Sequence, residues 1–400
     1  MSQPSTGSDL ALLGTEGPSG DPAVYVAGVG MTQFGKQPAR GPDDLGREAV
    51  WAALQDAGID PRKVEAAYCG HVFQGMAVGQ RVMGLVGLAG IPVTNVENVC
   101  SSGATAIREA HLAIRSGEYD VVLAFGVENL TGKFRGALTP DPDDLEALQG
   151  MTMPAIYAMR ARKHMETYGT TSDQLALVSV KNKRNAALNP YAQTKQAVTL
   201  EEVKASRLIA DPLRLLECSP VSDGGAAAVL VSGRVVRALG VRKPIRLAAT
   251  ALYSGTYDTG LTDMAFEPLT WRTAQAAYER AGIGPADVDF AEVHDCFSSA
   301  EVMRVEGLGL VPRGEYPRFV EAGHADIGGK LPVNPSGGLL GKGHPLGATG
   351  VAQVVELVRQ LRGEAGPRQI ANAKVGLAHC RGGKAAGIEG AACTVIILTV

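Results

Sequence analysis

The stretch Asn98-Val99-Cys100-Ser101-Ser102-Gly103-Ala104-Thr105 places one cysteine where a loop is expected to turn into a helix. Ile107, Ala110 and Ile114 follow at helical spacing, so the sequence predicts a helix directly after this cysteine. The start of a helix offers unpaired backbone N–H groups and the positive end of the helix dipole, and both favour a thiolate. Most isolated cysteines are structural, so interpreting Cys100 as a nucleophile requires support from elsewhere in the chain.

That support begins near the carboxyl end of the chain. Gly347-Ala348-Thr349 repeats Gly103-Ala104-Thr105, and the same offset carries Cys100 onto His344. Apolar residues recur at helical spacing from Val351 onward, so a helix is expected after the histidine too. The sequence therefore predicts a cysteine and a histidine at matching positions before matching helices.

A second repeat indicates two similar halves. Ala57-Gly58-Ile59 matches Ala281-Gly282-Ile283, and each copy follows an amphipathic helical pattern and precedes a short apolar run. In the second copy, the run 290–293 ends at His294-Asp295-Cys296-Phe297. The predicted fold class is therefore α/β, with a chain built from two related α/β halves.

The predicted organisation has four parts. Residues 1–22 contain no lysine or arginine and are rich in Ser, Gly and Pro, which predicts a disordered tail. Residues 23–126 and 216–232 form the predicted first half, and residues 243–400 form the second. Residues 127–215 interrupt the first half with loops and helical segments, which predicts an inserted loop domain.

Composition and charge narrow the function classes. The chain has 400 residues, a net charge of −3 and no apolar run near the roughly 20 residues that span a bilayer, so neither nucleic-acid binding nor a membrane span is expected. Six cysteines show no Cys-x-x-Cys metal spacing, and the N-terminus lacks a basic secretory start. We therefore expect reduced thiols, no metal site and a cytoplasmic location.

Gly28-Val29-Gly30 is a weak dinucleotide-binding signal, since the third glycine and the acidic residue of that motif are missing.

Four motifs occur in a fixed order: Cys-Ser-Ser-Gly at 100–103, His-Asp-Cys-Phe at 294–297, Asn-Pro-Ser-Gly-Gly leading to Gly-His-Pro within 334–345, and a glycine loop with a cysteine at 380–383. Together they resemble the thiolase superfamily, and the His-Asp-Cys-Phe form looks like the sterol carrier protein X type. The resemblance covers about residues 23–400. It implies a thiolase-like fold whose two halves pack as an α-β-α-β-α layered core, with a loop domain inserted in the first half.

The resemblance also implies an activity. Thiolases are acyl-CoA C-acyltransferases, which cleave 3-ketoacyl-CoA with CoA or condense acyl-CoAs by Claisen chemistry. Coenzyme A thioesters are then substrates, no cofactor is bound permanently, and the protein is expected to be a homodimer or a dimer of dimers. Neither the length of the acyl chain nor the direction of the reaction follows from the sequence.

The matching motifs imply roles for individual residues. Cys100 would carry the acyl group. His344 would activate the Cys100 thiol, since a histidine beside a cysteine lowers the thiol pKa by forming an ion pair. His294 would donate to the thioester oxygen. The backbone N–H groups of Cys100 and of residues 380–383 would form the other oxyanion hole.

Two cysteines compete for the role of the second acid/base. Many thiolases place this group in a closing Cys-x-Gly loop, which Cys380-Arg381-Gly382 matches. The sterol carrier protein X type is understood to use the cysteine of His-Asp-Cys-Phe, here Cys296. We favour Cys296, because its motif match is longer and because bulky Arg381 departs from the usual glycine-rich loop.

The predicted loop domain carries a basic group that includes Lys181, Lys183 and Arg184. In thiolases this domain holds much of the coenzyme A, so these side chains are candidates for binding its phosphates. A solvated helix face explains such a charge run equally well.

The sequence leaves two other functions open. One is a thiolase-fold aldolase of sterol side-chain degradation; such relatives tend to replace the catalytic Cys and His, whereas this chain retains Cys100, His294, Cys296 and His344. The other is a subunit that works only with a small OB-fold, zinc-ribbon partner protein, as some bacterial relatives do. Nothing in the sequence tests the second alternative.

Overall fold

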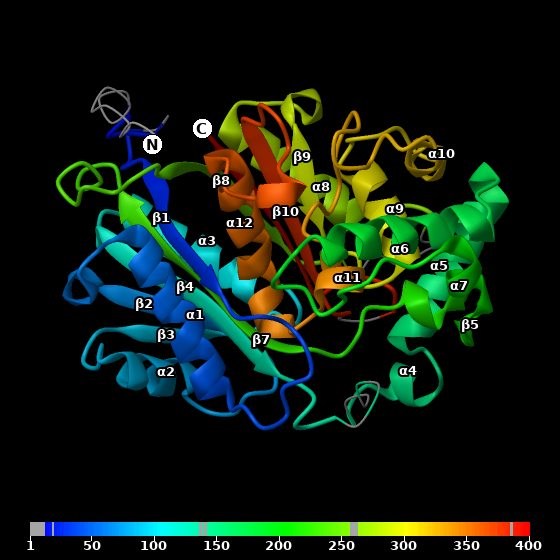
Figure 1. The fold of residues 1–400 in the computed structure, drawn as a ribbon, viewed down its shortest axis with the longest axis horizontal. Helices are drawn as coiled ribbons and strands as arrows, with labels where there is room; N and C mark the ends of the chain where they lie inside the picture. Colours follow the sequence, from blue (N-terminus) through cyan, green and yellow to red (C-terminus); the bar gives the residue numbers. More distant parts are fainter. Residues whose placement is uncertain are drawn as a thin grey trace.

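A computed structural model describes residues 13–17, 20–134, 136, 138, 142–256, 263–384 and 387–400 (Figure 1). Its strands form a nine-stranded mixed sheet in the order β3-β2-β4-β7-β1-β8-β11-β10-β9 and a small β5-β6 pair. The strands are β1 Val24–Met31, β2 Ala66–Gly70, β3 Val93–Val96, β4 Val121–Asn129, β5 Leu208–Ala210, β6 Leu213–Arg214, β7 Asp223–Ser232, β8 Ile245–Tyr253, β9 Phe290–Val293, β10 Val375–Gly382 and β11 Ala392–Thr399.

The helices pack against the faces of this sheet. They are α1 Pro42–Ala57, α2 Val78–Val86, α3 Ser102–Arg115, α4 Leu145–Leu148, α5 Met153–Tyr168, α6 Ser172–Ala187, α7 Leu200–Ala205, α8 Pro268–Ala281, α9 Ser298–Gly307, α10 Tyr316–Glu321, α11 Gly338–Lys342 and α12 Leu346–Arg362.

The two halves predicted from the sequence meet at β1 and β8. The first half contributes β3, β2, β4, β7 and β1, and the second contributes β8, β11, β10 and β9. Tyr25 pairs with Arg246 and Val26 with Ile245, so a short antiparallel contact joins the halves into one continuous sheet. The strands of both halves are apolar almost throughout, as expected when helices cover both faces of a sheet.

The layers follow from three hydrophobic clusters. One cluster packs α3 and α12 between the two halves of the sheet, another packs α1 and α2 on the outer face of the first half, and a third packs α8 and α9 on that of the second. Figure 1 shows α12 between the strands of the two halves. The predicted α-β-α-β-α layering is therefore confirmed.

The insertion between β4 and β7 carries α4 to α7 and the β5-β6 pair. It belongs to the first half in sequence, but α6 packs against α9, α10 and α11 of the second half, and α5 packs against α9 (Figure 1). The insertion thus contacts the helix that follows the His-Asp-Cys-Phe motif.

The described part of the N-terminal segment differs from the expected disordered tail. Tyr25 donates from its hydroxyl to the carbonyl of Gly14, and Asp21 pairs with Arg115 of α3. Leu13 packs partly buried on the outer cluster of the first half. Residues 13–17 and 20–22 are therefore held against the body of the protein, because an apolar side chain and backbone carbonyls find partners there; residues 1–12, 18 and 19 lie outside the described part of the chain. Across the residues described, no helix combines the length and apolarity that a membrane crossing requires.

Candidate active site

The repeated Gly-Ala-Thr segments are the point where α3 and α12 touch. A Cβ on Gly103 would lie 2.4 Å from the carbonyl oxygen of Gly347, and one on Gly350 would lie 2.4 Å from the backbone nitrogen of Ala104. Only glycine permits so close an approach of two backbones. The first turns of both helices are therefore in contact, which brings the residues before each helix together.

Cys100 precedes α3 and His344 precedes α12, as the repeat predicts. Together with His294, they present one side-chain nitrogen or sulfur each, and these three atoms all lie within 4.8 Å of one another. The rings of His294 and His344 meet edge to face, with centroids 4.9 Å apart. The sequence-predicted nucleophile, its base and the predicted thioester-oxygen donor thus form one cluster at the meeting point of the two halves.

The structure fixes the orientation of His344 through two hydroxyls. Its Nδ1 lies 2.8 Å from Oγ1 of Thr349, the last residue of the repeated Gly-Ala-Thr segment, and its backbone N–H donates to Oγ of Ser222 at 3.0 Å. Because Nδ1 is engaged, Nε2 is the ring nitrogen available to Cys100. Thr105, the matching threonine of the first half, accepts from Asn98 Nδ2 at 3.0 Å and so supports the turn that carries the cysteine.

The turn before α3 is tightly confined. Val99 has a φ of 51°, an uncommon conformation for a β-branched residue, and such strained positions often occur at functional sites. A Cβ on Gly382 would lie 2.0 Å from the carbonyl oxygen of Asn98, so the closing loop at the end of β10 requires glycine there. The backbone N–H of Gly383 donates to the sulfur of Cys100. This contact agrees with the predicted contribution of the 380–383 loop to the site.

The charge state of the pair differs from the predicted ion pair. Burial raises the pKa of Cys100 to about 12, reinforced by the proximity of Cys296, although the Gly383 N–H opposes the shift. Burial lowers the pKa of His344 to about 3, and the positive charge of Arg304 acts in the same direction. Both groups are therefore neutral before substrate binds, because desolvation outweighs the helix dipole. His344 then acts as a general base that takes the proton only as the sulfur attacks.

This charge state predicts a flat pH profile for acylation. An ordinary histidine titrates near pH 6.5, but His344 with a pKa of about 3 keeps its basic nitrogen free at any pH well above that value. The single-turnover rate of acylation should consequently show no step between pH 5 and pH 8. Rapid-quench measurements of acyl-enzyme formation across this range check the expectation, and an inflection near pH 6.5 would contradict it.

The His-Asp-Cys-Phe motif lies between the end of β9 and the start of α9. Asp295 accepts from the backbone N–H groups of Leu339 at 2.6 Å and Leu340 at 3.2 Å at the start of α11. Asn334 accepts from the N–H of Val293 at 2.8 Å, and its own amide donates to Glu301. Both side chains therefore hold the backbone around the motif rather than face the substrate.

The two candidate acid/base thiols both lie at the site but have different neighbours. Cys380 donates from Sγ to the carbonyl oxygen of Cys100 at 3.0 Å, and the same sulfur lies 3.3 Å from Nδ1 of His294. The sulfur of Cys296 lies 3.5 Å from Nη1 of Arg304. Arg381 does not obstruct this arrangement, because successive side chains of a strand point to opposite faces and its guanidinium pairs with Glu267 behind β10.

The prediction that Lys181, Lys183 and Arg184 bind coenzyme A phosphates is wrong for the two lysines. Lys181 is buried and pairs with Glu301 at 2.9 Å, and Lys183 donates to the carbonyl oxygen of Leu340 at 2.7 Å. Burial lowers the pKa of Lys183 to about 8. Arg184 is exposed but pairs with Asp326. These residues face the second half because α6 packs on α9, α10 and α11, so the lysines stabilise that contact and do not meet coenzyme A at a surface.

The cluster of Cys100, His294 and His344 also has the side-chain types that zinc binds. The sequence showed no metal-ligand spacing, because the three residues come from segments far apart in the chain. Their convergence is a tertiary feature. The resemblance to thiolases leads us to expect that the same three groups serve acyl transfer.

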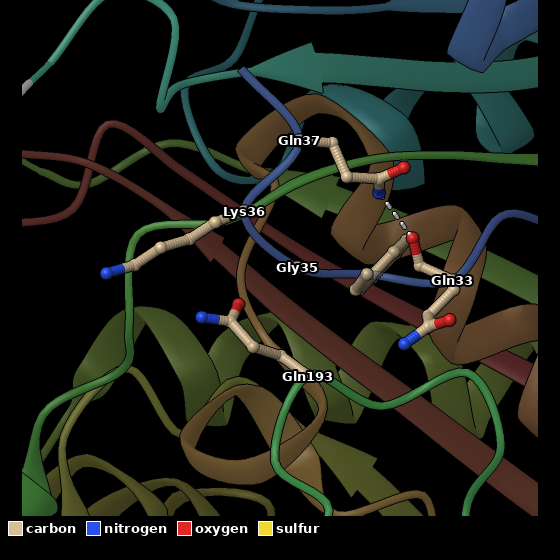
Figure 2. Close-up of a pocket in the computed structure, with 6 residues that line it drawn as sticks. Gln33, Gly35, Lys36, Gln37 and Gln193 are labelled. Atoms are coloured by element: carbon tan, nitrogen blue, oxygen red, sulfur yellow. Dashed lines mark hydrogen bonds between the residues drawn. The ribbon is translucent and has the colours of Figure 1, made fainter. Parts of the chain in front are cut away.

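A surface cavity of about 410 Å³ lies beside the active-site scaffold (Figure 2). Residues 33–37 and Gln193 line it, and Figure 2 labels Lys36 and Gln193 among the lining residues. Gln193 accepts from Oγ of Ser222 at 2.6 Å, and that oxygen accepts from the N–H of His344. The cavity is thus separated from His344 by one side chain.

Sequence reasoning missed several residues that build the site. Thr349 was visible as part of the repeat, but its contact with His344 was not. Arg304 in α9 reads as an ordinary helical arginine, yet it is buried and its guanidinium contacts the carbonyl of His294, the sulfur of Cys296 and the hydroxyl of Tyr157. No sequence signal distinguishes such an arginine from a solvated one.

Residues 24–234 match the family model described as Thiolase, N-terminal domain, and residues 257–397 match that described as Thiolase C-terminal domain-like. An acetyl-CoA acetyltransferase of Methanothermobacter thermautotrophicus is 44% identical over 369 residues, which cover 90% of this chain and 96% of that protein. The benzoylsuccinyl-CoA thiolase subunit BbsB of Thauera aromatica is 41% identical, with 93% and 98% covered. Sterol carrier protein 2 of Oryctolagus cuniculus is 41% identical, with 90% of this chain and 69% of that protein covered.

Solved structures give the same grouping. An Ltp2-ChsH2(DUF35) aldolase superposes with a TM-score of 0.83 at 29% identity, over 95% of this chain and 98% of that chain. Human mitochondrial 3-ketoacyl-CoA thiolase superposes with a TM-score of 0.72 at 20% identity, over 94% and 98%, and shows the fold alone. Two family models that cover both halves, and relatives matched over nearly the whole chain, show that this chain belongs to the thiolase superfamily.

Proposed function

We propose that the protein is an acyl-CoA C-acyltransferase that forms an acyl-enzyme on Cys100 and makes or breaks a carbon–carbon bond next to a thioester. One observation carries this proposal: reactive atoms of Cys100, His294 and His344 lie within 4.8 Å of one another at the joined starts of α3 and α12. A nucleophile, a neutral base and a second imidazole are the groups that transfer of an acyl group between thiols requires.

In the acylation step, the sulfur of Cys100 attacks the thioester carbonyl while His344 takes the thiol proton. The bond between the carbonyl carbon and the CoA sulfur then breaks, and His344 returns the proton to the leaving thiolate. Burial holds the pKa of His294 well below its ordinary value, so its ring is neutral and donates one N–H to the developing oxyanion.

In the carbon–carbon step, a thiolate takes a proton from the α-carbon of a second acyl-CoA. The electron pair of that C–H bond attacks the acyl carbonyl on Cys100, and the bond from that carbon to the Cys100 sulfur breaks. The proton held by the acid/base thiol then passes to the departing Cys100 sulfur, which restores both groups. The products are a 3-ketoacyl-CoA and free Cys100, and thiolysis is the reverse sequence. Cys296 and Cys380 are the two candidates for this group, because each of these thiols lies close to Cys100.

The test of the proposal is the mass of the intact protein after incubation with a panel of acyl-CoAs of different chain length. We expect a mass increase equal to one acyl group for at least one member, and its removal by free CoA. The panel also reads out which acyl chain the site prefers. Absence of any acyl adduct across the panel would contradict the proposed function.

A second candidate, a thiolase-fold aldolase of sterol side-chain degradation, is favoured by one observation. The solved structure that superposes with a TM-score of 0.83 is that of an aldolase. Against it stands the retention and convergence of Cys100, His294 and His344, which an aldol cleavage without an acyl-enzyme does not need. Release of an aldehyde or ketone without thiolysis, in the absence of an acyl adduct, would favour the aldolase.

We further propose partners for the chain. Two of the relatives are named as parts of assemblies, a thiolase subunit and an Ltp2-ChsH2(DUF35) aldolase. These names support a partner protein for this chain. Its identity as the OB-fold, zinc-ribbon protein expected from the sequence is our proposal, which co-purification can test. A homodimer is supported by β3, which ends the nine-stranded sheet as an edge strand and leaves one side available for a second copy. We also propose the cytoplasmic location that is expected from the sequence.

A further inference from the structure

Arg304 is a buried cation placed directly against the thiol of the His-Asp-Cys-Phe motif. Its side chain is 1% exposed, and Nη1 contacts both the carbonyl oxygen of His294 and the sulfur of Cys296, the latter at 3.5 Å. Its Nη2 contacts the hydroxyl of Tyr157, and the guanidinium lies over the Tyr157 ring at 5.3 Å. Tyr157 of the insertion therefore contacts the Arg304 guanidinium, and so do His294 and Cys296 of the His-Asp-Cys-Phe motif.

The charge of Arg304 is only partly neutralised by its surroundings. Its Nε lies 3.5 Å from Glu267, but Glu267 also pairs with Arg381. Although burial opposes it, the guanidiniums of Arg381, Arg304 and Arg160 hold the pKa of Glu267 well below its usual range. One buried carboxylate is thus shared among three buried guanidiniums, and a further anion next to Arg304 would be stabilised.

The neighbours of Cys380 are hydrogen-bond acceptors rather than a cation. The single S–H of Cys380 can donate either to the carbonyl oxygen of Cys100, at 3.0 Å, or to Nδ1 of His294, at 3.3 Å. Both contacts favour the protonated thiol, and burial raises the pKa of Cys380 well above its ordinary value. When Cys380 donates to Nδ1, His294 carries its proton on Nε2, which suits it to donate to an oxyanion.

We propose that Arg304 is the positioning residue that holds the Cys296 sulfur and stabilises its thiolate, so that Cys296 removes the α-carbon proton while Cys380 remains a neutral thiol that orients His294. This inference rests on the proposed acyl transfer for its catalytic meaning, but the charge state of Cys296 is measurable without any substrate. The proton moves from the α-carbon to the Cys296 sulfur, and Arg304 itself exchanges none.

Other titratable groups also face Cys296 and must be held constant in a test. Glu267 lies behind Arg304, with Arg381 and Arg160 beyond it. The groups near Cys296 itself are Arg304 from α9, Tyr157 from α5, Cys100 before α3, Cys218 before β7, and Cys380 from β10.

The experiment measures alkylation of Cys296 by iodoacetamide as a function of pH from 6 to 10, by peptide mass spectrometry, in a Cys100→Ala background. We expect Arg304→Met to shift the onset of alkylation upward by about one pH unit, which lowers the rate near pH 7.5 by about tenfold, because a neighbouring cation typically moves a titration by that much. Arg304→Lys keeps a positive charge and should restore part of the rate. Circular dichroism shows whether each variant is folded.

Arg160→Met is the matched control. It removes a guanidinium from the same buried cluster, but Arg160 contacts the carbonyls of Met264, Phe266 and Ile388 and not the thiol. Its alkylation profile should follow that of the Cys100→Ala parent. The inference would be overturned by equal shifts in Arg160→Met and Arg304→Met, or by an Arg304→Met profile that matches the parent. It would also be overturned if Arg304→Lys showed the same profile as Arg304→Met, or if Cys296 in the parent were not alkylated up to pH 10. Failure of acylation in the wild-type protein would instead contradict the proposed function.

Discussion

Replacing Cys100 with alanine should abolish formation of the acyl-enzyme while leaving the fold intact. The sulfur is the only atom that the substitution removes, and the turn at 98–101 keeps its backbone hydrogen bonds to the start of α3. Without the sulfur, no covalent intermediate can form, and both thiolysis and condensation should fall to background. Intact-protein mass spectrometry with the preferred acyl-CoA checks the adduct, and thermal unfolding checks the fold.

Cys218→Ala is the matched control for this experiment. Cys218 is also half-buried, but its sulfur contacts the carbonyl of Arg214 and is not part of the cluster of Cys100, His294 and His344. That variant should gain the acyl mass as the wild type does. An acyl adduct that persists in Cys100→Ala and maps to the same peptide would show that Cys100 is not the nucleophile.

Replacing Cys296 with serine should separate the two half-reactions. Acylation of Cys100 needs no proton from an α-carbon, so the variant should accept an acyl group at a normal single-turnover rate. Condensation and thiolysis should fall by roughly 10²–10⁴-fold, the usual contribution of a positioned acid/base. A serine hydroxyl is too weakly acidic to replace a thiol near neutral pH, even beside Arg304.

Cys380→Ser is the comparison that makes this prediction decisive. A serine hydroxyl can still donate to the carbonyl of Cys100 or to Nδ1 of His294, which are the contacts that Cys380 makes. This variant should therefore lose less carbon–carbon activity than Cys296→Ser. If Cys380→Ser acylates normally and fails at thiolysis while Cys296→Ser retains it, the closing-loop cysteine is the acid/base and the assignment to Cys296 is wrong.

The repeats in the sequence were sufficient to predict the fold class, the two halves and the pairing of Cys100 with His344. Each repeat encodes the same local event, a helix that starts after a reactive residue with Gly-Ala-Thr in its first turn. Because small residues allow close backbone approach, the two helix starts could be expected to meet, and Gly103 and Gly347 do meet. The order of the four motifs identified the superfamily for the same reason: each motif is a short, local pattern.

The charge states of the site were decided only by the tertiary structure. Cys100 and His344 were expected as an ion pair, but burial by surrounding segments keeps both neutral. Lys181 and Lys183 read as a solvated or phosphate-binding group, yet the packing of α6 on the second half buries them. Desolvation depends on atoms contributed by distant parts of the chain, and no local pattern records it.

The same reason separates the two acid/base candidates. In sequence, Cys296 and Cys380 each match a thiolase motif, and the length of the match was the main basis for choosing between them. In the folded chain, one sulfur faces the guanidinium of Arg304 and the other faces a carbonyl oxygen and an imidazole. The sequence by itself determined which residues gather at the joined helix starts. The long-range packing of α5, α9 and β10 determined which of these residues holds a proton, because the electric field at a buried atom is the sum of the contributions of all atoms around it in space.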